Sequence, residues 1–158
     1  GARPEGGERV IARQVNDAQP GYVVKLVKRA LPAGVNLQGL RIAALGLAFK
    51  ADVDDLRESP AIEVAHLLQK EGAHVLGFEP FKPDAQLPGL LTVPTLEEAL
   101  QNADLLLLLV RHAPLIQLSP LKMVQMTPAR IAVDTVNGWD PAAWRGAGFS
   151  LQRLGVGG

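Results

Sequence analysis

Apolar residues follow two different spacings along the chain. Over residues 8–31 they recur every three or four positions, which predicts helix, and Pro20 divides this helical pattern into two segments. A Pro/Gly-containing linker follows at 32–39, and short apolar runs typical of β-strands then occupy 41–49, 74–79, 91–93, 105–110, 130–136 and 149–154. Helices are expected between these runs, at 60–71, 96–103, 120–126 and 141–145.

The alternation of strands and helices predicts the fold class. Strands separated by helical connections pair in parallel, with helices on both faces of the sheet. We therefore predict an α/β protein with a doubly wound, mostly parallel, Rossmann-like sheet, preceded by a long N-terminal helical arm. Residues 1–38 would form the arm and linker, and residues 39–158 a ligand-binding α/β domain. Because the arm has apolar residues on more than one side, it should pack on that domain or on a second chain.

Composition and charge narrow the classes of function. The sequence has 16 basic and 16 acidic side chains, and this balance gives no broad positive field of the kind that a nucleic-acid-binding domain needs. The absence of cysteine excludes a disulfide framework, a thiolate metal site and a cysteine nucleophile within these residues, and three scattered histidines do not predict a metal site. The longest apolar run, 105–110, is too short to cross a bilayer, and residues 1–7 do not resemble a signal peptide. We therefore expect a cytoplasmic protein without nucleic-acid or membrane partners.

The turn after the first predicted strand is the most informative candidate site, because ligands bind at the carboxyl ends of strands in such sheets. Lys50 and Arg57 lie in a long loop that leads to a helix N-terminus predicted at Ser59. A lysine, an arginine fork and a helix N-terminus suit a phosphate-bearing ligand. From the pattern alone, the two cations could equally be solvated and pair with the acids of the same loop, Asp52, Asp54, Asp55 and Glu58. The turn has one glycine where a dinucleotide fingerprint has three, so it does not predict a bound NAD pyrophosphate.

Three further kinds of residue have alternative interpretations. His112 follows the run 105–110 and either faces a ligand or packs within its loop. Glu79 could accept a ribose hydroxyl or cap the turn that precedes Pro80. Trp139 and Trp144 are expected to pack the last helix rather than to stack on a base.

The same loop carries a family resemblance. Residues 46–50, Gly-Leu-Ala-Phe-Lys, and 54–60, Asp-Asp-Leu-Arg-Glu-Ser-Pro, resemble the signature of the C-terminal, UDP-binding domain of the UDP-glucose/GDP-mannose dehydrogenase family. Glu79, Pro80 and His112 resemble the branch of UDP-N-acetyl-D-mannosamine dehydrogenases more than the UDP-glucose branch. Matching segments cover nearly the whole sequence in the family's order, at 15–20, 72–80, 103–112, 134–135 and 148–155.

The resemblance implies a role for the chain within a larger enzyme. Members of this family oxidise the C6 alcohol of a nucleotide sugar to a carboxylate in two NAD-dependent steps, which use a cysteine upstream of the segment matched here. The resemblance implies that NAD is bound mainly by a separate N-terminal dehydrogenase domain, that the chain alone is inactive, and that the helical arm forms a homodimer. It also implies that the substrate is a UDP-sugar, in the synthesis of cell-surface polysaccharide precursors. The alternatives are a stand-alone nucleotide-binding or regulatory module, an unrelated doubly wound domain such as a flavin binder, and a structural or dimerisation piece with an inactive pocket.

Site residues follow from the resemblance by position. Phe49 and Lys50 match the family's substrate-binding pair, and Arg57 matches an arginine that contacts NAD across the cleft between domains. His112 is a further candidate for substrate binding, and no catalytic or metal-binding residue is expected in this chain. The sequence departs from the family two positions after Asp134, where Val136 replaces a substrate-contacting basic residue and Arg111, on a neighbouring turn, is a candidate substitute.

Overall fold

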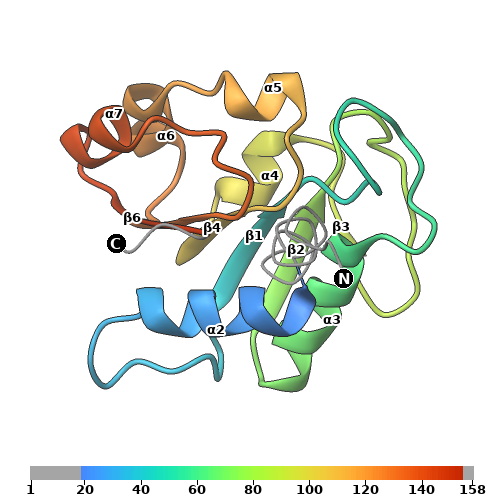
Figure 1. Cartoon of the computed structure of the whole chain (residues 1–158), viewed down its shortest axis with the longest axis horizontal. Helices are drawn as coiled ribbons and strands as arrows, with labels where there is room; N and C mark the ends of the chain where they lie inside the picture. The colour runs from blue at the N-terminus through green and yellow to red at the C-terminus, as the bar shows by residue number, and fades with distance from the viewer. Residues whose placement is uncertain (1–18, 155–158) are drawn as a thin grey trace, which may run out of the picture.

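The computed structural model describes residues 19–154, which form a six-stranded sheet between two layers of helices (Figure 1). The strands are β1 (Arg41–Leu45), β2 (His74–Phe78), β3 (Leu91–Thr92), β4 (Leu105–Leu108), β5 (Ile131–Asp134) and β6 (Ser150–Arg153). The helices are α2 (Pro20–Ala30), α3 (Pro60–Lys70), α4 (Leu96–Leu100), α5 (Ala113–Ile116), α6 (Pro120–Met126) and α7 (Pro141–Gly146).

The strand order β3-β2-β1-β4-β5-β6 sets β1 and β4 side by side at the centre of the sheet. All five pairs of neighbouring strands are parallel, and Ala44 of β1 lies opposite Gly77 of β2 and Leu107 of β4. The chain builds the sheet outward from β1 in one direction and outward from β4 in the other. This is the doubly wound order, in which the carboxyl ends of the two central strands form a topological switch point. The predicted fold class is therefore confirmed.

Two apolar cores hold the helical layers to the sheet. Helices α2 and α3 pack on one face, whereas α4, α6 and α7 pack on the other (Figure 1). The four leucines of β4 are fully buried and contribute alternately to both cores, as the unbroken apolar run predicts. Burying a leucine side chain stabilises the fold by about 1.5–3 kcal/mol, so β4 is a principal source of the sheet's stability.

Strand β1 is shorter than the predicted run 41–49, because the chain turns away from the sheet at Gly46. The φ angle of Gly46 is +94°, and a Cβ built there would lie 2.8 Å from the Cβ of Val110. Only glycine fits this combination of backbone angle and close approach. The turn directs the following residues over the carboxyl edge of the sheet.

The long N-terminal arm is not supported by the structure. The helical pattern predicted at 8–31 is represented by α2, an 11-residue helix that begins at Pro20, and the rest of the predicted arm lies outside the described residues. Helix α2 buries Val23, Val24, Leu26 and Val27 in the core that it shares with α3 and the sheet. Of the two packing partners considered for the arm, the α/β domain is the one that α2 contacts. A boundary at residue 38 and a dimer through the arm stay predictions.

Side-chain caps fix the starts of several helices. Ser59 Oγ accepts a hydrogen bond from Ala61 N at 3.2 Å and Thr95 Oγ1 accepts one from Glu98 N at 3.2 Å, which confirms both predicted N-caps. Trp139 and Trp144 are buried and stacked at 3.8 Å between ring centroids, so their predicted packing role is confirmed. Among residues 19–154, no helix combines the length and apolar character needed to span a bilayer.

Candidate functional site

A cleft of about 410 Å³ opens at the carboxyl ends of β1 and β4, the switch point of the sheet. Three loops and two helices line it. The lining residues are Val23 of α2, Ala48–Ala51 after β1, Pro60, Ala61 and Val64 of α3, Leu109–Arg111 after β4, and Thr135 and Val136 after β5. The cleft is mainly apolar inside, and its charged side chains are Lys50 and Arg111.

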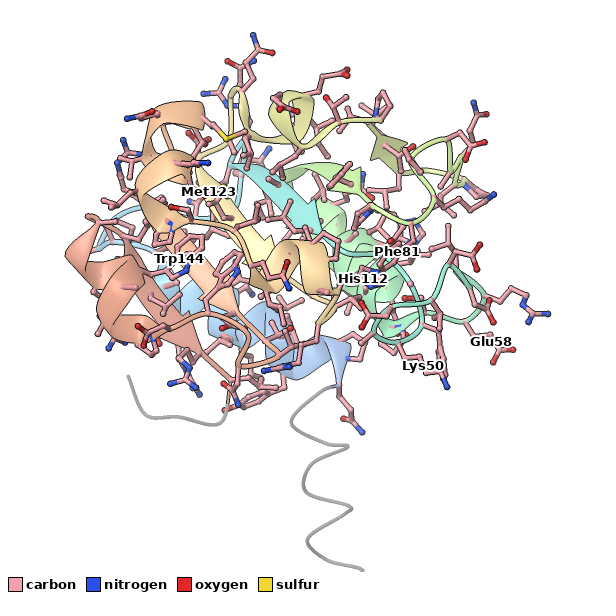
Figure 2. All side chains as sticks on the ribbon, turned by 90° about the horizontal axis from the view of Figure 1, so that it is seen from above. Lys50, Glu58, Phe81, His112, Met123 and Trp144 are labelled. Atoms are coloured by element: carbon pink, nitrogen blue, oxygen red, sulfur yellow. The ribbon has the colours of Figure 1, made fainter. Side chains whose placement is uncertain are left out.

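The loop after β1 presents two of the predicted site residues at this cleft. Phe49 is 52% exposed although it is aromatic, and Lys50 is exposed beside it at the outer edge of the molecule (Figure 2). The loop folds back on itself, because Phe49 N donates to Asp55 O at 2.6 Å and Ser59 Oγ donates to Ala48 O at 3.1 Å. Among the described residues, Lys50 has no carboxylate partner within ion-pair distance. The ring and the ammonium group are therefore available at the cleft.

Arg57 lies in a different environment from Lys50. Its side chain is 88% exposed and does not line the cleft. Its guanidinium forms a bidentate ion pair with Asp55, with Nε–Oδ1 and Nη2–Oδ2 distances of 3.0 Å each. Hydrogen bonds from the side chain and backbone of Arg57 lower the pKa of Asp55 to about 2, and Asp55 in turn raises the pKa of Arg57. Of the two interpretations that the sequence allowed, pairing with a loop acid is the one observed for Arg57.

His112 lies beneath this loop and is completely buried. Its Nδ1 accepts a hydrogen bond from Asp52 N at 2.8 Å, so the proton is on Nε2, which donates to Glu79 Oε1 at 2.9 Å. The ring makes a T-shaped contact with Phe81, with centroids 4.6 Å apart, and the two side chains lie together in Figure 2. Both ring nitrogens are thus satisfied within the protein. Direct contact between His112 and a ligand stays a prediction, and the geometry favours a positioning role.

Glu79 is the centre of the same buried network. Its Oε1 accepts from Leu47 N and Ala48 N at 2.8 and 2.9 Å as well as from His112, and its Oε2 accepts from Phe81 N at 2.9 Å. The carboxylate therefore joins the loops that follow β1, β2 and β4. Asp52 completes the connection, because its Oδ1 accepts from Ala113 N at 2.9 Å. The network preorganises the backbone that carries Phe49 and Lys50.

The loop after β5 is held by Asp134, which is fully buried. Its carboxylate accepts three backbone N–H groups, from Val136 and Gly138 to Oδ1 and from Trp139 to Oδ2, at 2.9–3.1 Å. Asn137 takes a left-handed conformation, with φ of 51°. The carbonyl oxygens of Val136 and Asn137 accept from Arg111 Nε and Nη2 at 3.3 and 3.5 Å. Arg111 thus contacts the loop at position 136, where the sequence has valine in place of the basic residue that the family resemblance implies.

The sequence singles out residues that line the cleft, but not most of the buried side chains that support its loops. Phe49, Lys50 and Arg111 lie together at the cleft, whereas Arg57 and His112 do not line it. Of the two interpretations of Glu79, the turn cap is the one observed, since its Oε2 accepts from Phe81 N. The contacts of Glu79 with the loops after β1 and β4, and the role of Asp134, had no local signal. Glu79 and His112 are 33 residues apart, so only the parallel order of β2, β1 and β4 brings them together.

The fold and the cleft define a class: an open, parallel α/β domain of the nucleotide-binding type, with cations at its switch point. Residues 43–141 match the family model described as the UDP-glucose/GDP-mannose dehydrogenase family, UDP binding domain. The chain belongs to this family and contains its C-terminal UDP-binding domain. The resemblance identified from the loop after β1 is therefore confirmed.

Individual relatives agree with the family assignment. UDP-N-acetyl-D-mannosamine dehydrogenase of Escherichia coli (strain K12) is 43% identical over 110 residues, which cover 65% of this chain and 26% of that protein. NDP-N-acetyl-D-galactosaminuronic acid dehydrogenase of Ralstonia solanacearum is 38% identical over 142 residues, which cover 87% of this chain and 32% of that protein. The crystal structure of NDP-N-acetyl-D-galactosaminuronic acid dehydrogenase from Methanosarcina mazei Go1 matches with a TM-score of 0.81 and 31% identity, covering 98% of this chain and 33% of that one. The matched region spans about a quarter to a third of the length of these relatives.

Proposed function

We propose that this chain holds the UDP part of a nucleotide sugar at the cleft between β1 and β4. In this proposal it is the substrate-binding part of an NAD-dependent nucleotide-sugar 6-dehydrogenase, of the UDP-N-acetylmannosamine or UDP-glucose type. The observation that carries the proposal is the pair Phe49 and Lys50, an exposed aromatic ring and an ammonium group without a carboxylate partner among the described residues. Both lie on a loop that a buried network holds at the switch point.

Each element of the cleft matches a part of a UDP-sugar. The Phe49 ring offers a flat apolar surface to the base or the sugar. The Lys50 ammonium is a point charge suited to a phosphate oxygen. The first turn of α3, with Pro60 and Ala61 at the cleft, adds the positive end of a helix dipole on the same side. Binding a remote, non-reacting part of the substrate in this way would orient the sugar for a reaction elsewhere.

The chemical steps fall outside these residues in this proposal. The sequence contains no cysteine, so it cannot supply the nucleophile that the family resemblance implies. The turn after β1 has only Gly46 and forms no three-glycine cradle for the pyrophosphate of NAD. We therefore propose that a separate dehydrogenase domain binds NAD and that Arg57 contributes a peripheral contact. The chain alone would be inactive. The full enzyme would be a cytoplasmic homodimer that acts in the synthesis of polysaccharide precursors.

The proposal is tested by calorimetric titration of UDP into the 158-residue chain, with NAD in parallel. Lys50→Ala should weaken UDP binding about tenfold or more, because a hydrogen bond to a charged group contributes about 1.5–3 kcal/mol. Lys70→Ala is the matched control, since Lys70 is an exposed lysine at the other end of α3. Equal UDP affinity in all three proteins, or tighter binding of NAD than of UDP, would contradict the proposal.

A further inference from the structure

Arg111 shares with Lys50 the lining of the cleft, and the two cations come from different loops. Lys50 follows β1, whereas Arg111 follows β4, the strand beside it. Across the part of the chain that the structure describes, Arg111 has no carboxylate within ion-pair distance. It therefore differs from Arg57, whose guanidinium forms a bidentate ion pair with the Asp55 carboxylate.

The guanidinium of Arg111 is instead positioned by neutral acceptors. Its Nε and Nη2 donate to the carbonyl oxygens of Val136 and Asn137 at 3.3 and 3.5 Å. Those carbonyls are themselves fixed, because the buried Asp134 carboxylate binds the backbone N–H groups of the same loop. Within the described chain Nη1 has no protein partner, so it remains available to a ligand. A carbonyl-held guanidinium keeps its full positive charge while losing part of its conformational freedom.

Position 136 cannot supply this charge, because it is a valine that also lines the cleft. A nucleoside diphosphate carries negative charge on two phosphate groups, and one lysine offers only a single point charge to them. An arginine fork matches phosphate oxygens in a bidentate geometry that a lysine does not provide. We propose that Arg111 is the second phosphate-binding cation of this cleft. This inference rests on the proposed function and assigns a further residue to the same site.

The experiment measures the Kd of UDP for the 158-residue chain at low and high salt, using calorimetry. Arg111→Gln removes the charge but keeps a side chain that can donate to the loop carbonyls. It should raise the Kd about tenfold or more at low salt and reduce the salt dependence of binding, because exposed charges interact more strongly when screening is weak. Arg41→Gln is the matched control, since Arg41 is at the amino end of β1, away from the cleft, and pairs with Asp104.

A second pair of variants separates a phosphate contact from a merely structural one. Arg111→Lys should lie between the wild type and Arg111→Gln, because it keeps the charge and loses the fork. Adding Val136→Arg to Arg111→Gln should restore part of the lost affinity, since position 136 lines the same cleft. Thermal unfolding of every variant reports whether the fold is retained.

The outcomes distinguish this inference from the proposed function. If the wild type binds UDP and Lys50→Ala weakens that binding, but Arg111→Gln changes the Kd less than twofold, only the role of Arg111 is overturned. A loss in Arg111→Gln that is equal at both salt concentrations and is not restored by Val136→Arg would also overturn it, because that pattern describes loop damage. If the wild type does not bind UDP, the proposed function is wrong, and the role of Arg111 is overturned with it.

Discussion

Replacing Glu79 with glutamine tests whether the buried network holds the loop that carries the cleft. The carboxylate accepts four hydrogen bonds, three to Oε1 from Leu47 N, Ala48 N and His112 Nε2, and one to Oε2 from Phe81 N. A glutamine must place its NH₂ group at one of these two positions. The less harmful choice faces Phe81 N–H, which leaves one donor unpaired at a cost of about 1–3 kcal/mol. The other three bonds lose their ionised acceptor, which weakens each by up to about 1 kcal/mol.

We therefore expect Glu79→Gln to lower the free energy of unfolding by about 2–4 kcal/mol, since such contributions are not fully additive. Urea unfolding followed by the fluorescence of the buried pair Trp139 and Trp144 measures this change. Glu97→Gln is the control, because Glu97 is exposed in the first turn of α4 and should change stability by less than about 0.5 kcal/mol. A loss below about 0.5 kcal/mol in Glu79→Gln would mean that this network does not hold the loop.

Two further predictions concern the ion pair and the turn. Asp55 should titrate with a pKa of about 2, and Arg57→Ala should return it towards its ordinary 3.8, as measured by NMR of the carboxyl carbon. Because folding lowers this pKa, its stabilising effect is present above about pH 4 and is lost as the pH falls towards 2; identical midpoints in both proteins would count against the pair. Gly46→Ala should destabilise the fold by about 1–3 kcal/mol, given a φ of +94° and a Cβ 2.8 Å from that of Val110. Thermal unfolding measures this loss. Gly21→Ala, whose added methyl group meets open space on α2, should leave stability unchanged or slightly higher, and equal losses in Gly46→Ala and Gly21→Ala would contradict the prediction.

Much of the fold could be predicted because local pattern and topology agree. The apolar run of β4 indicated a strand buried on both faces, and the alternation with helices indicated a parallel sheet. Element ends were harder to predict, since they depend on contacts between distant residues. Strand β1 stops at Leu45 because Gly46 approaches Val110, and α5 is a single turn that lacks a detectable period.

Only part of the site could be predicted, because its geometry also depends on contacts between distant residues. Lys50 and Arg57 have the same local signal, two cations in a loop rich in acids, and only the folded loop shows that Asp55 pairs with Arg57. His112 follows a central strand, which left both a ligand-facing and a loop-packing residue open, and hydrogen bonds to Glu79 and Asp52 hold its ring in the interior. Burial of this kind is set by three loops at once, and no single segment of sequence encodes it.

The most direct test of the account is to map where UDP binds by NMR titration of the isotope-labelled chain. We predict the largest amide shifts at the cleft, at the carboxyl ends of the strands, in residues 48–51, 110–111 and 135–136. A second cavity of about 370 Å³ lies at the other end of the strands, where His74 and Asn102 are among its lining residues, and it provides an internal comparison. Shifts concentrated around that cavity, or no shifts at saturating UDP, would contradict the central claim that this chain holds UDP at the switch point.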